Sequence, residues 1–232
     1  MGQSEVQYLE VGGRSIAYRY RKASGPTLIF LPGYGSDMAG NKALALDAFA
    51  EDHKRSLLRL DYSGTGSSAG KFEDGTLERW LEEVVAIVDE VTEGPLLVIG
   101  SSMGGWIGLH VTLLRPDRVQ ALIGVAAAPD FTNWGFADGG AAVAAGLAGG
   151  FWESGQKLLL LDSPIDIACP VRLIHGELDQ DVPLDTALGT MRALRSADVQ
   201  LLVLKGSGHR LSEPHEIDAI LRTVAELLEQ VS

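Results

Sequence analysis

The sequence predicts an α/β protein with a mostly parallel sheet of eight strands that is flanked by helices. Short apolar runs alternate along the chain with longer segments in which apolar residues recur every three or four positions. Most of these runs lack an inside–outside alternation, which is typical of parallel strands buried on both faces. A length of 232 residues suits one domain, so we expect a single α/β domain over residues 1–232.

The elements follow in order from these patterns. Residues 6–11 and 15–21 flank Gly12-Gly13 and predict an antiparallel hairpin. Residues 76–92 place apolar side chains at helical spacing and acidic ones on the opposite face, which indicates an amphipathic helix. Further strands are expected at 27–31, 56–62, 95–100, 121–127, 171–176 and 199–204, and further helices at 103–115, 184–195 and 214–230.

Residues 131–168 interrupt this alternation between two predicted strands. The segment combines a stretch rich in Gly and Ala with several aromatic residues. An insertion of this size in an α/β domain is often a lid, so we expect a small cap over the site. Trp134, Phe136 and Trp152 are then the candidate substrate contacts. An ordinary crossover helix with a loose loop is the alternative.

Composition restricts the function classes. Lys and Arg number 19 against 31 Asp and Glu, and a net charge of −12 repels nucleic-acid phosphates. One cysteine, Cys169, excludes an internal disulfide framework and a cysteine-rich zinc site. The N-terminus shows no targeting pattern, and no apolar run reaches the ~18 residues of a membrane span. We therefore expect a cytoplasmic protein, monomeric or homodimeric, with no nucleic-acid partner and no membrane span.

Two Gly-x-Ser-x-Gly patterns occur, centred on Ser68 and Ser102. A serine nucleophile on such a turn needs a buried strand before it and a helix after it, because the turn must hold the hydroxyl clear of the sheet. The run 95–100 ends just before Ser102 and a helical pattern follows, whereas loop residues follow Ser68. Ser102 is therefore the predicted nucleophile and Ser68 a turn residue.

The glycine loop around Ser68 also resembles nucleotide-binding loops. No helix begins where a bound pyrophosphate would need one, and Phe72 stands where a phosphate loop requires Ser or Thr. We therefore expect neither a nucleotide cofactor nor a metal.

A serine hydroxyl needs a base and an orienting acid to react at neutral pH. His209 lies in a glycine loop just beyond the last predicted strand, at the carboxyl edge where sites of α/β proteins form. His215, at the start of the next helix, is the alternative base. Three carboxylates follow the preceding strand, at Glu177, Asp179 and Asp181. Asp179 is the predicted acid and the other two are its alternatives.

Several motifs match one superfamily in the same order along the chain. They are Leu31-Pro32-Gly33-Tyr34-Gly35, Asp61-Tyr62-Ser63-Gly64-Thr65-Gly66-Ser67-Ser68, the turn at Ser102 and His175-Gly176-Glu177-Leu178-Asp179. With them, the chain resembles the α/β-hydrolase superfamily over essentially its full length, and the order Ser102, Asp179, His209 is that of this fold. The resemblance implies an oxyanion hole formed by the backbone N–H groups of Tyr34 and Met103.

Three segments are closer to one branch of the superfamily. Residues 33–43, 61–64 and 100–106 are similar to acyl-protein thioesterases, whose mitochondrial members depalmitoylate proteins and hydrolyse acyl glucuronides. The similarity implies a metal-free serine hydrolase that cleaves carboxylic esters or thioesters of small molecules or acylated proteins through an acyl-enzyme. No transit peptide is recognisable, so the mitochondrial location is not expected to carry over.

Two alternatives share the fold. One is a non-catalytic small-molecule-binding protein on a hydrolase scaffold, and the other is a cofactor-free haloperoxidase or C–C hydrolase. Fluorophosphonate labelling distinguishes the first, because an occluded serine would not react. A substrate panel of esters, thioesters, acyl glucuronides and β-diketones distinguishes the second.

Overall fold

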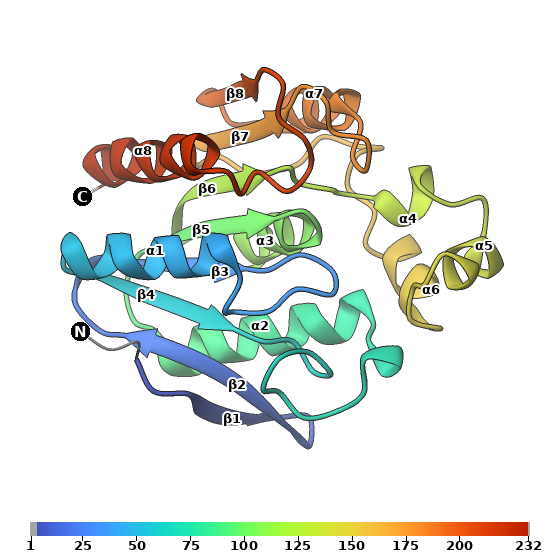
Figure 1. Cartoon of the computed structure of the whole chain (residues 1–232), viewed down its shortest axis with the longest axis horizontal. Coiled ribbons are helices and arrows are strands. Elements are labelled where there is room, and N and C mark those ends of the chain that lie inside the picture. Colours follow the sequence, from blue (N-terminus) through green and yellow to red (C-terminus); the bar gives the residue numbers. More distant parts are fainter. Residues whose placement is uncertain (1–3, 232) are drawn as a thin grey trace.

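Eight strands form one sheet in the order β1-β2-β4-β3-β5-β6-β7-β8 in the computed structural model, which describes residues 4–231 (Figure 1). β2 pairs antiparallel with β1 and β4, and all other pairs are parallel. The carboxyl ends of β3 to β8 therefore lie at one edge of the sheet. The strands are β1 (Gln7–Val11), β2 (Arg14–Arg21), β3 (Ser24–Leu31), β4 (Arg55–Leu60), β5 (Leu96–Ser101), β6 (Val119–Val125), β7 (Val171–Gly176) and β8 (Val199–Leu204).

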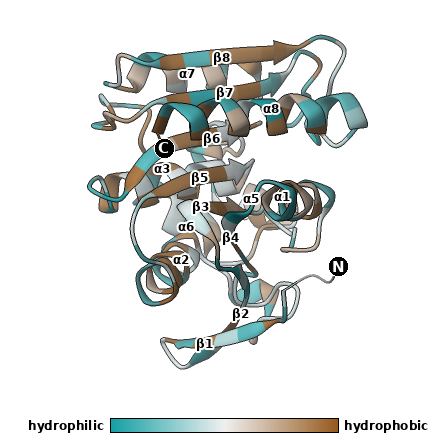
Figure 2. Ribbon diagram, turned by 90° about the vertical axis from the view of Figure 1, so that its left-hand side faces the viewer, coloured by the Kyte–Doolittle hydropathy of each residue, from teal (hydrophilic) through white to brown (hydrophobic). Residues whose placement is uncertain are grey.

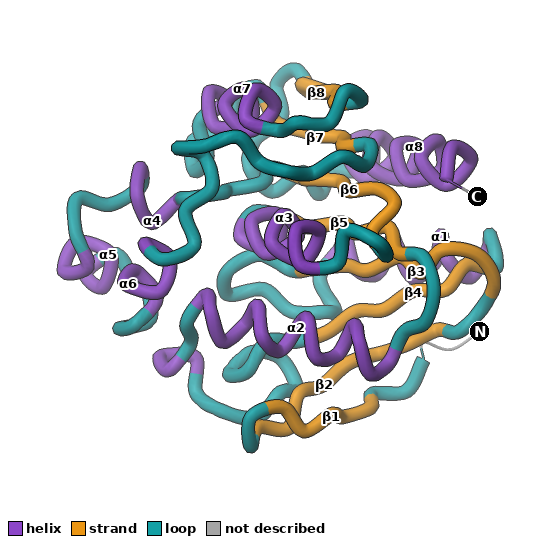
Figure 3. The backbone as a smooth tube through the Cα atoms, turned by 180° about the vertical axis from the view of Figure 1, so that it is seen from behind, coloured by secondary structure: helices purple, strands orange, loops and turns teal. Residues whose placement is uncertain are grey.

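Helices cover both faces of this sheet, as Figures 1 and 3 show from opposite sides. α1 (Asn41–Asp52) and α8 (Pro214–Val231) lie on one face, and α2 (Leu77–Val91), α3 (Met103–Leu114) and α7 (Leu184–Ala193) lie on the other. Each face has its own buried apolar cluster. Figure 2 shows hydrophobic colouring along the central strands and a largely hydrophilic β1 at the edge.

The predicted fold class is confirmed, and the ends of the elements differ by a few residues. β4 ends at Leu60 rather than at Tyr62, because the Asp61 carboxylate accepts hydrogen bonds from Met38 N and Ser67 N and the chain turns there. Helix α1 was not predicted, since its apolar residues show little helical periodicity and its buried side includes Asp47. In the β1–β2 hairpin, Gly12 and Gly13 adopt φ of +55° and +76°, and a two-residue type I′ turn requires positive φ at both positions.

The segment 131–168 leaves the carboxyl edge of the sheet between β6 and β7. It holds three short helices, α4 (Phe131–Trp134), α5 (Gly139–Ala144) and α6 (Phe151–Gln156), rather than one crossover helix. Figure 1 shows them beyond the carboxyl ends of the strands. A 3-10 turn, η1 (Phe72–Asp74), precedes α2. Within residues 4–231, every helix is too short or too polar to cross a membrane.

Candidate active site

Ser102 stands at a sharp turn between β5 and α3. Its backbone has φ +54° and ψ −120°, a conformation that costs energy for a residue with a side chain. Two glycines make the turn sterically possible. A Cβ on Gly100 would lie 2.2 Å from the Gly104 carbonyl oxygen, and a Cβ on Gly104 would lie 2.2 Å from the Leu31 carbonyl oxygen. The glycine spacing around Ser102 therefore reflects close backbone packing.

His209 and Asp179 form a hydrogen-bonded chain that ends on Ser102. His209 Nε2 lies 3.0 Å from Ser102 Oγ, and His209 Nδ1 lies 2.8 Å from Asp179 Oδ2. The Asp179 side chain is fully buried, and its Oδ1 accepts hydrogen bonds from Asp181 N and Val182 N at 2.9 and 2.8 Å. With Nδ1 donating to this fixed carboxylate, a neutral His209 presents the lone pair of Nε2 to the hydroxyl.

None of the three alternatives belongs to this hydrogen-bonded chain, although Asp181 lines the cavity that contains Ser102. His215 is exposed at the start of α8. Glu177 is exposed and accepts a hydrogen bond from Gly206 N. Asp181 is exposed, and it contacts Asp179 through its backbone amide.

His175 is a site residue that the sequence analysis did not identify as one. It is buried at the end of β7, and its Nε2 lies 2.9 Å from the Val182 carbonyl oxygen and 3.5 Å from Asp179 Oδ2. It therefore packs against the loop that presents the acid. The signal in the sequence is its place four residues before Asp179.

The loop that follows β3 lies over Ser102. A Cβ on Gly33 would be 3.3 Å from Ser102 Cβ. Tyr34 comes next, and Tyr34 and Met103 both line the cavity that contains Ser102. Met103 is the first residue of α3, where a backbone N–H has no acceptor within the helix.

The hydroxyl of Ser68 has a structural role. Ser68 Oγ donates to the Asp61 carbonyl oxygen at 2.7 Å and accepts from Ala17 N at 2.8 Å. The first contact ties the glycine loop to the end of β4, and the second ties it to β2. The two serines thus differ in their contacts: Ser68 Oγ binds backbone groups, whereas Ser102 Oγ lies 3.0 Å from His209 Nε2.

Two cavities meet at His209. One, of about 220 Å³, contains Ser102 and is lined mainly by apolar side chains, including Phe131, Trp134 and Phe136. The other, of about 730 Å³, has a mixed polar and apolar lining and lies between residues 32–43 and 208–216. Trp152 is absent from the lining of both, because it lies in α6 against Gly139 of α5.

Three side chains at this site form the one candidate metal-binding group within residues 4–231. Asp179, Asp181 and His209 place one ligand-type atom each within 4.8 Å of one another. However, the two nitrogens of His209 are already paired with Asp179 and Ser102. This pairing favours a proton relay over a cation site.

Comparison with known proteins shows the family of the chain. A family model described as the alpha/beta hydrolase fold matches residues 26–144. The chain belongs to the α/β-hydrolase family. The human protein named palmitoyl-protein thioesterase ABHD10, mitochondrial, is 36% identical over 94% of this chain and 78% of its own length. This α/β hydrolase is thus an ester or thioester hydrolase, as expected from the sequence.

Solved structures give the same family. The mouse alpha/beta hydrolase domain-containing protein 10 matches 99% of this chain and 100% of its own with a TM-score of 0.92 and 32% identity. A putative hydrolase from Agrobacterium vitis matches 97% of this chain and 98% of its own with a TM-score of 0.88 and 33% identity.

One expectation is corrected by these relatives. The cytoplasmic location expected from the sequence is contradicted, because five mammalian relatives that are 34–36% identical are all named mitochondrial. The expectation rested on a single cysteine, which indicates a reducing compartment without saying which one, and on the lack of a recognisable targeting pattern in the first residues of the sequence.

Proposed function

We propose that this hydrolase releases acyl groups from thioesters and carboxylic esters, including acylated proteins, through a Ser102–His209–Asp179 triad. The observation that carries the proposal is the continuous hydrogen-bonded chain from Ser102 Oγ through His209 to the buried Asp179. A relay of this order activates a hydroxyl, which is otherwise a weak nucleophile at neutral pH.

In the first half-reaction, Ser102 Oγ attacks the acyl carbonyl carbon and its proton moves to His209 Nε2. The carbonyl oxygen becomes an oxyanion, which the backbone N–H groups of Tyr34 and Met103 stabilise; such a donor is worth ~3 kcal/mol. His209 then passes the proton to the departing oxygen or sulfur. Asp179 stays ionised and stabilises the imidazolium.

In the second half-reaction, water attacks the acyl-enzyme. His209 takes a proton from the water, and the second oxyanion collapses with release of the carboxylic acid. The proton on Nε2 returns to Ser102 Oγ, which restores the starting state. No co-reactant besides water is needed.

The two cavities support a division of the substrate. We assign the acyl group to the apolar cavity of about 220 Å³ beside Ser102, with Trp134 and Phe136 as its contacts from the cap. We assign the leaving group to the cavity of about 730 Å³ that also borders His209, where the walls supply hydrogen-bonding groups such as Ser36 and Asn41. Trp152 has no part in this assignment.

The test is Ser102→Ala, with Ser68→Ala as the matched serine variant. We expect Ser102→Ala to lose at least about 10³-fold in turnover of p-nitrophenyl esters, acyl thioesters and acyl glucuronides, while circular dichroism and Tm stay unchanged. Ser68→Ala should keep its turnover per folded molecule. Near wild-type hydrolysis by Ser102→Ala would refute the proposal.

A further inference from the structure

Tyr34 connects two parts of the molecule that meet at the active site. Its backbone N–H belongs to the loop over Ser102, whereas its side chain reaches the cap. Tyr34 Oη accepts a hydrogen bond of 2.7 Å from Ala148 N, which lies between α5 and α6. Burial raises the pKa of the Tyr34 phenol, so the hydroxyl stays neutral at physiological pH.

The two ends of the Tyr34 loop are held by the main body of the domain. The Tyr62 hydroxyl donates to the Pro32 carbonyl oxygen at 3.0 Å. Four residues after Tyr34, Met38 N donates to the buried Asp61 carboxylate at 2.7 Å. The residue that carries the oxyanion donor lies between these two anchors, and its own side-chain hydrogen bond goes to the cap.

The Tyr34 ring lies between aromatic groups of both parts. Its centroid is 5.0 Å from that of Phe72 and 5.7 Å from that of Trp80, which belong to the body. It is also 5.0 Å from Phe151 and 6.5 Å from Phe131, which belong to the cap. The ring therefore forms part of the joint between cap and body.

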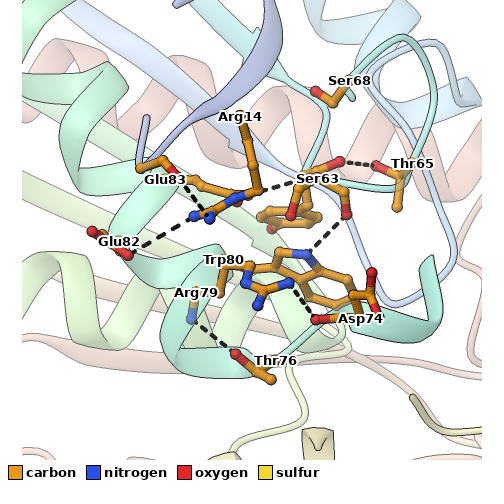
Figure 4. Close-up of polar contacts among 12 residues, drawn as sticks. Arg14, Ser63, Thr65, Ser68, Asp74, Thr76, Arg79, Trp80, Glu82 and Glu83 are labelled. Carbon is orange, nitrogen blue, oxygen red and sulfur yellow. Dashed lines mark hydrogen bonds and ion pairs between the residues drawn. The ribbon is translucent and has the colours of Figure 1, made fainter. Parts of the chain in front are cut away.

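The body side of this joint is rigidly built. Trp80 Nε1 donates to the Ser63 carbonyl oxygen at 3.1 Å, and Ser63 N donates to the fully buried Glu83 at 2.9 Å. Arg14 Nε donates to the same carboxylate, as Figure 4 shows. This network holds the Trp80 indole in place. A movement at the contact between cap and body is therefore expected to displace the cap rather than Trp80.

The cap is firmly attached at its base and less so at its tip. Asp130 accepts hydrogen bonds from Leu160 N and Leu161 N, which closes the base. Most residues from 133 to 150 are exposed, and Ala148 is one of the few buried there. The hydrogen bond from Ala148 N to Tyr34 therefore joins the end of this exposed stretch to the body, next to the fully buried Phe151 and the 2.8 Å hydrogen bond from Glu78 N to Ser154 Oγ. Phe131 at the base also lines the acyl cavity.

We propose that the Tyr34 hydroxyl is a positioning group that makes the alignment of its own backbone N–H depend on the docked cap. The inference rests on the proposed function. An acyl chain that packs against the cap stabilises the docked position, and the docked cap holds the oxyanion donor in place. Binding of the acyl chain therefore raises the rate constant of acylation, because the donor stabilises only the charge that develops in the transition state.

The test is Tyr34→Phe, which keeps the ring but removes the acceptor for Ala148 N. Pre-steady-state release of p-nitrophenolate gives the acylation rate constant and the apparent substrate dissociation constant for acetate, butyrate and hexanoate esters. For the wild type, we expect the rate constant to rise with acyl length. For Tyr34→Phe, we expect a loss of about tenfold with hexanoate and about twofold with acetate, because a partly misplaced donor forfeits part of its effect.

A second measurement uses alkyl trifluoromethyl ketones, which add to Ser102 and form an oxyanion. The hexyl compound should lose about tenfold in affinity for Tyr34→Phe, and the methyl compound about twofold. The pH profile of kcat/KM should keep its midpoint, because His209 is not altered. Tyr18→Phe is the matched control, since it removes a tyrosine hydrogen bond to Gln7 in the β1–β2 hairpin.

Equal losses for acetate and hexanoate, or no loss for either, would overturn the positioning role. An effect confined to the dissociation constant would also overturn it, because a hydroxyl that only shapes the pocket would act on binding alone. Failure of the proposed function has a different signature: wild-type protein would show no burst, or Ser102→Ala would retain one.

Discussion

Acyl-chain preference provides a quantitative prediction from the size of the cavity at Ser102. Its volume of about 220 Å³ holds roughly seven non-hydrogen atoms if each takes about 30 Å³, the share of a water molecule in the liquid. The two carbons of an acetyl group fill two of these places, with its oxygen at the backbone N–H groups of the oxyanion hole, which leaves room for about five methylenes. Each buried methylene contributes about 0.8 kcal/mol, or roughly fourfold in kcat/KM.

Five methylenes set an upper limit of ~4 kcal/mol, or about 10³-fold, and incomplete enclosure reduces it. We therefore expect kcat/KM to rise from acetate to about hexanoate or octanoate and then to level off or fall. Longer chains, including palmitoyl, exceed this volume and gain little. The assay is a p-nitrophenyl ester series from acetate to palmitate, kept below the micelle threshold.

Phe136→Ala enlarges the cavity and should move the plateau two or three carbons further. Trp152→Ala is the matched control, because Trp152 lies in the cap but not in the cavity lining. The reasoning is refuted by a steady rise through palmitate for the wild type, or by an equal shift in both variants.

Further predictions concern the acid, the cysteine and the turn. Asp179→Asn should lower kcat by as much as ~10⁴-fold, because it favours the wrong His209 tautomer. Asp181→Asn should lower kcat by less than about threefold. Equal losses in steady-state assays would contradict the assignment of Asp179 as the acid. Burial raises the pKa of Cys169 to about 11, so the reactive thiolate is scarce at pH 8, and iodoacetamide should leave activity intact until the pH approaches 11. Inactivation of folded protein at pH 8 would contradict this. Gly104→Ala places a Cβ 2.2 Å from the Leu31 carbonyl oxygen and should lower the free energy of unfolding, measured with urea, by at least about 2 kcal/mol. Gly189→Ala, on an open face of α7, should raise the free energy of unfolding by up to about 1 kcal/mol. Similar changes in both variants would contradict the steric argument.

The sequence was sufficient for the sheet and for the residues that meet at Ser102. A residue that directly follows a parallel strand can be placed from the sequence, because the carboxyl ends of parallel strands share one edge of the sheet. Ser102, Asp179 and His209 each follow a different strand, so the sequence alone predicts that their side chains lie close together. The context of Ser68 likewise separated a turn residue from a nucleophile candidate.

The sequence predicted a small cap at 131–168 but not the orientation of its helices. Its aromatic residues are similar in type, yet Trp134 and Phe136 line the cavity while Trp152 faces α5, and such a difference depends on the orientation of short helices. The contact between the Tyr34 hydroxyl and Ala148 N spans 114 positions and uses a backbone amide, which leaves no mark in the sequence. The place of His175 four residues before Asp179 indicates that it lies near the acid, but it does not reveal that the imidazole contacts the Val182 carbonyl oxygen.

The central claim is that Ser102 carries the acyl group, and covalent trapping tests it most directly. A fluorophosphonate, or a rapidly quenched excess of a p-nitrophenyl ester, is mixed with the protein, and the adduct is located by peptide mass spectrometry. We predict one adduct per chain on Ser102, none on Ser101 or Ser68, and no adduct on Ser102→Ala. An adduct on another residue, or none on a protein that still hydrolyses the ester, would contradict the claim.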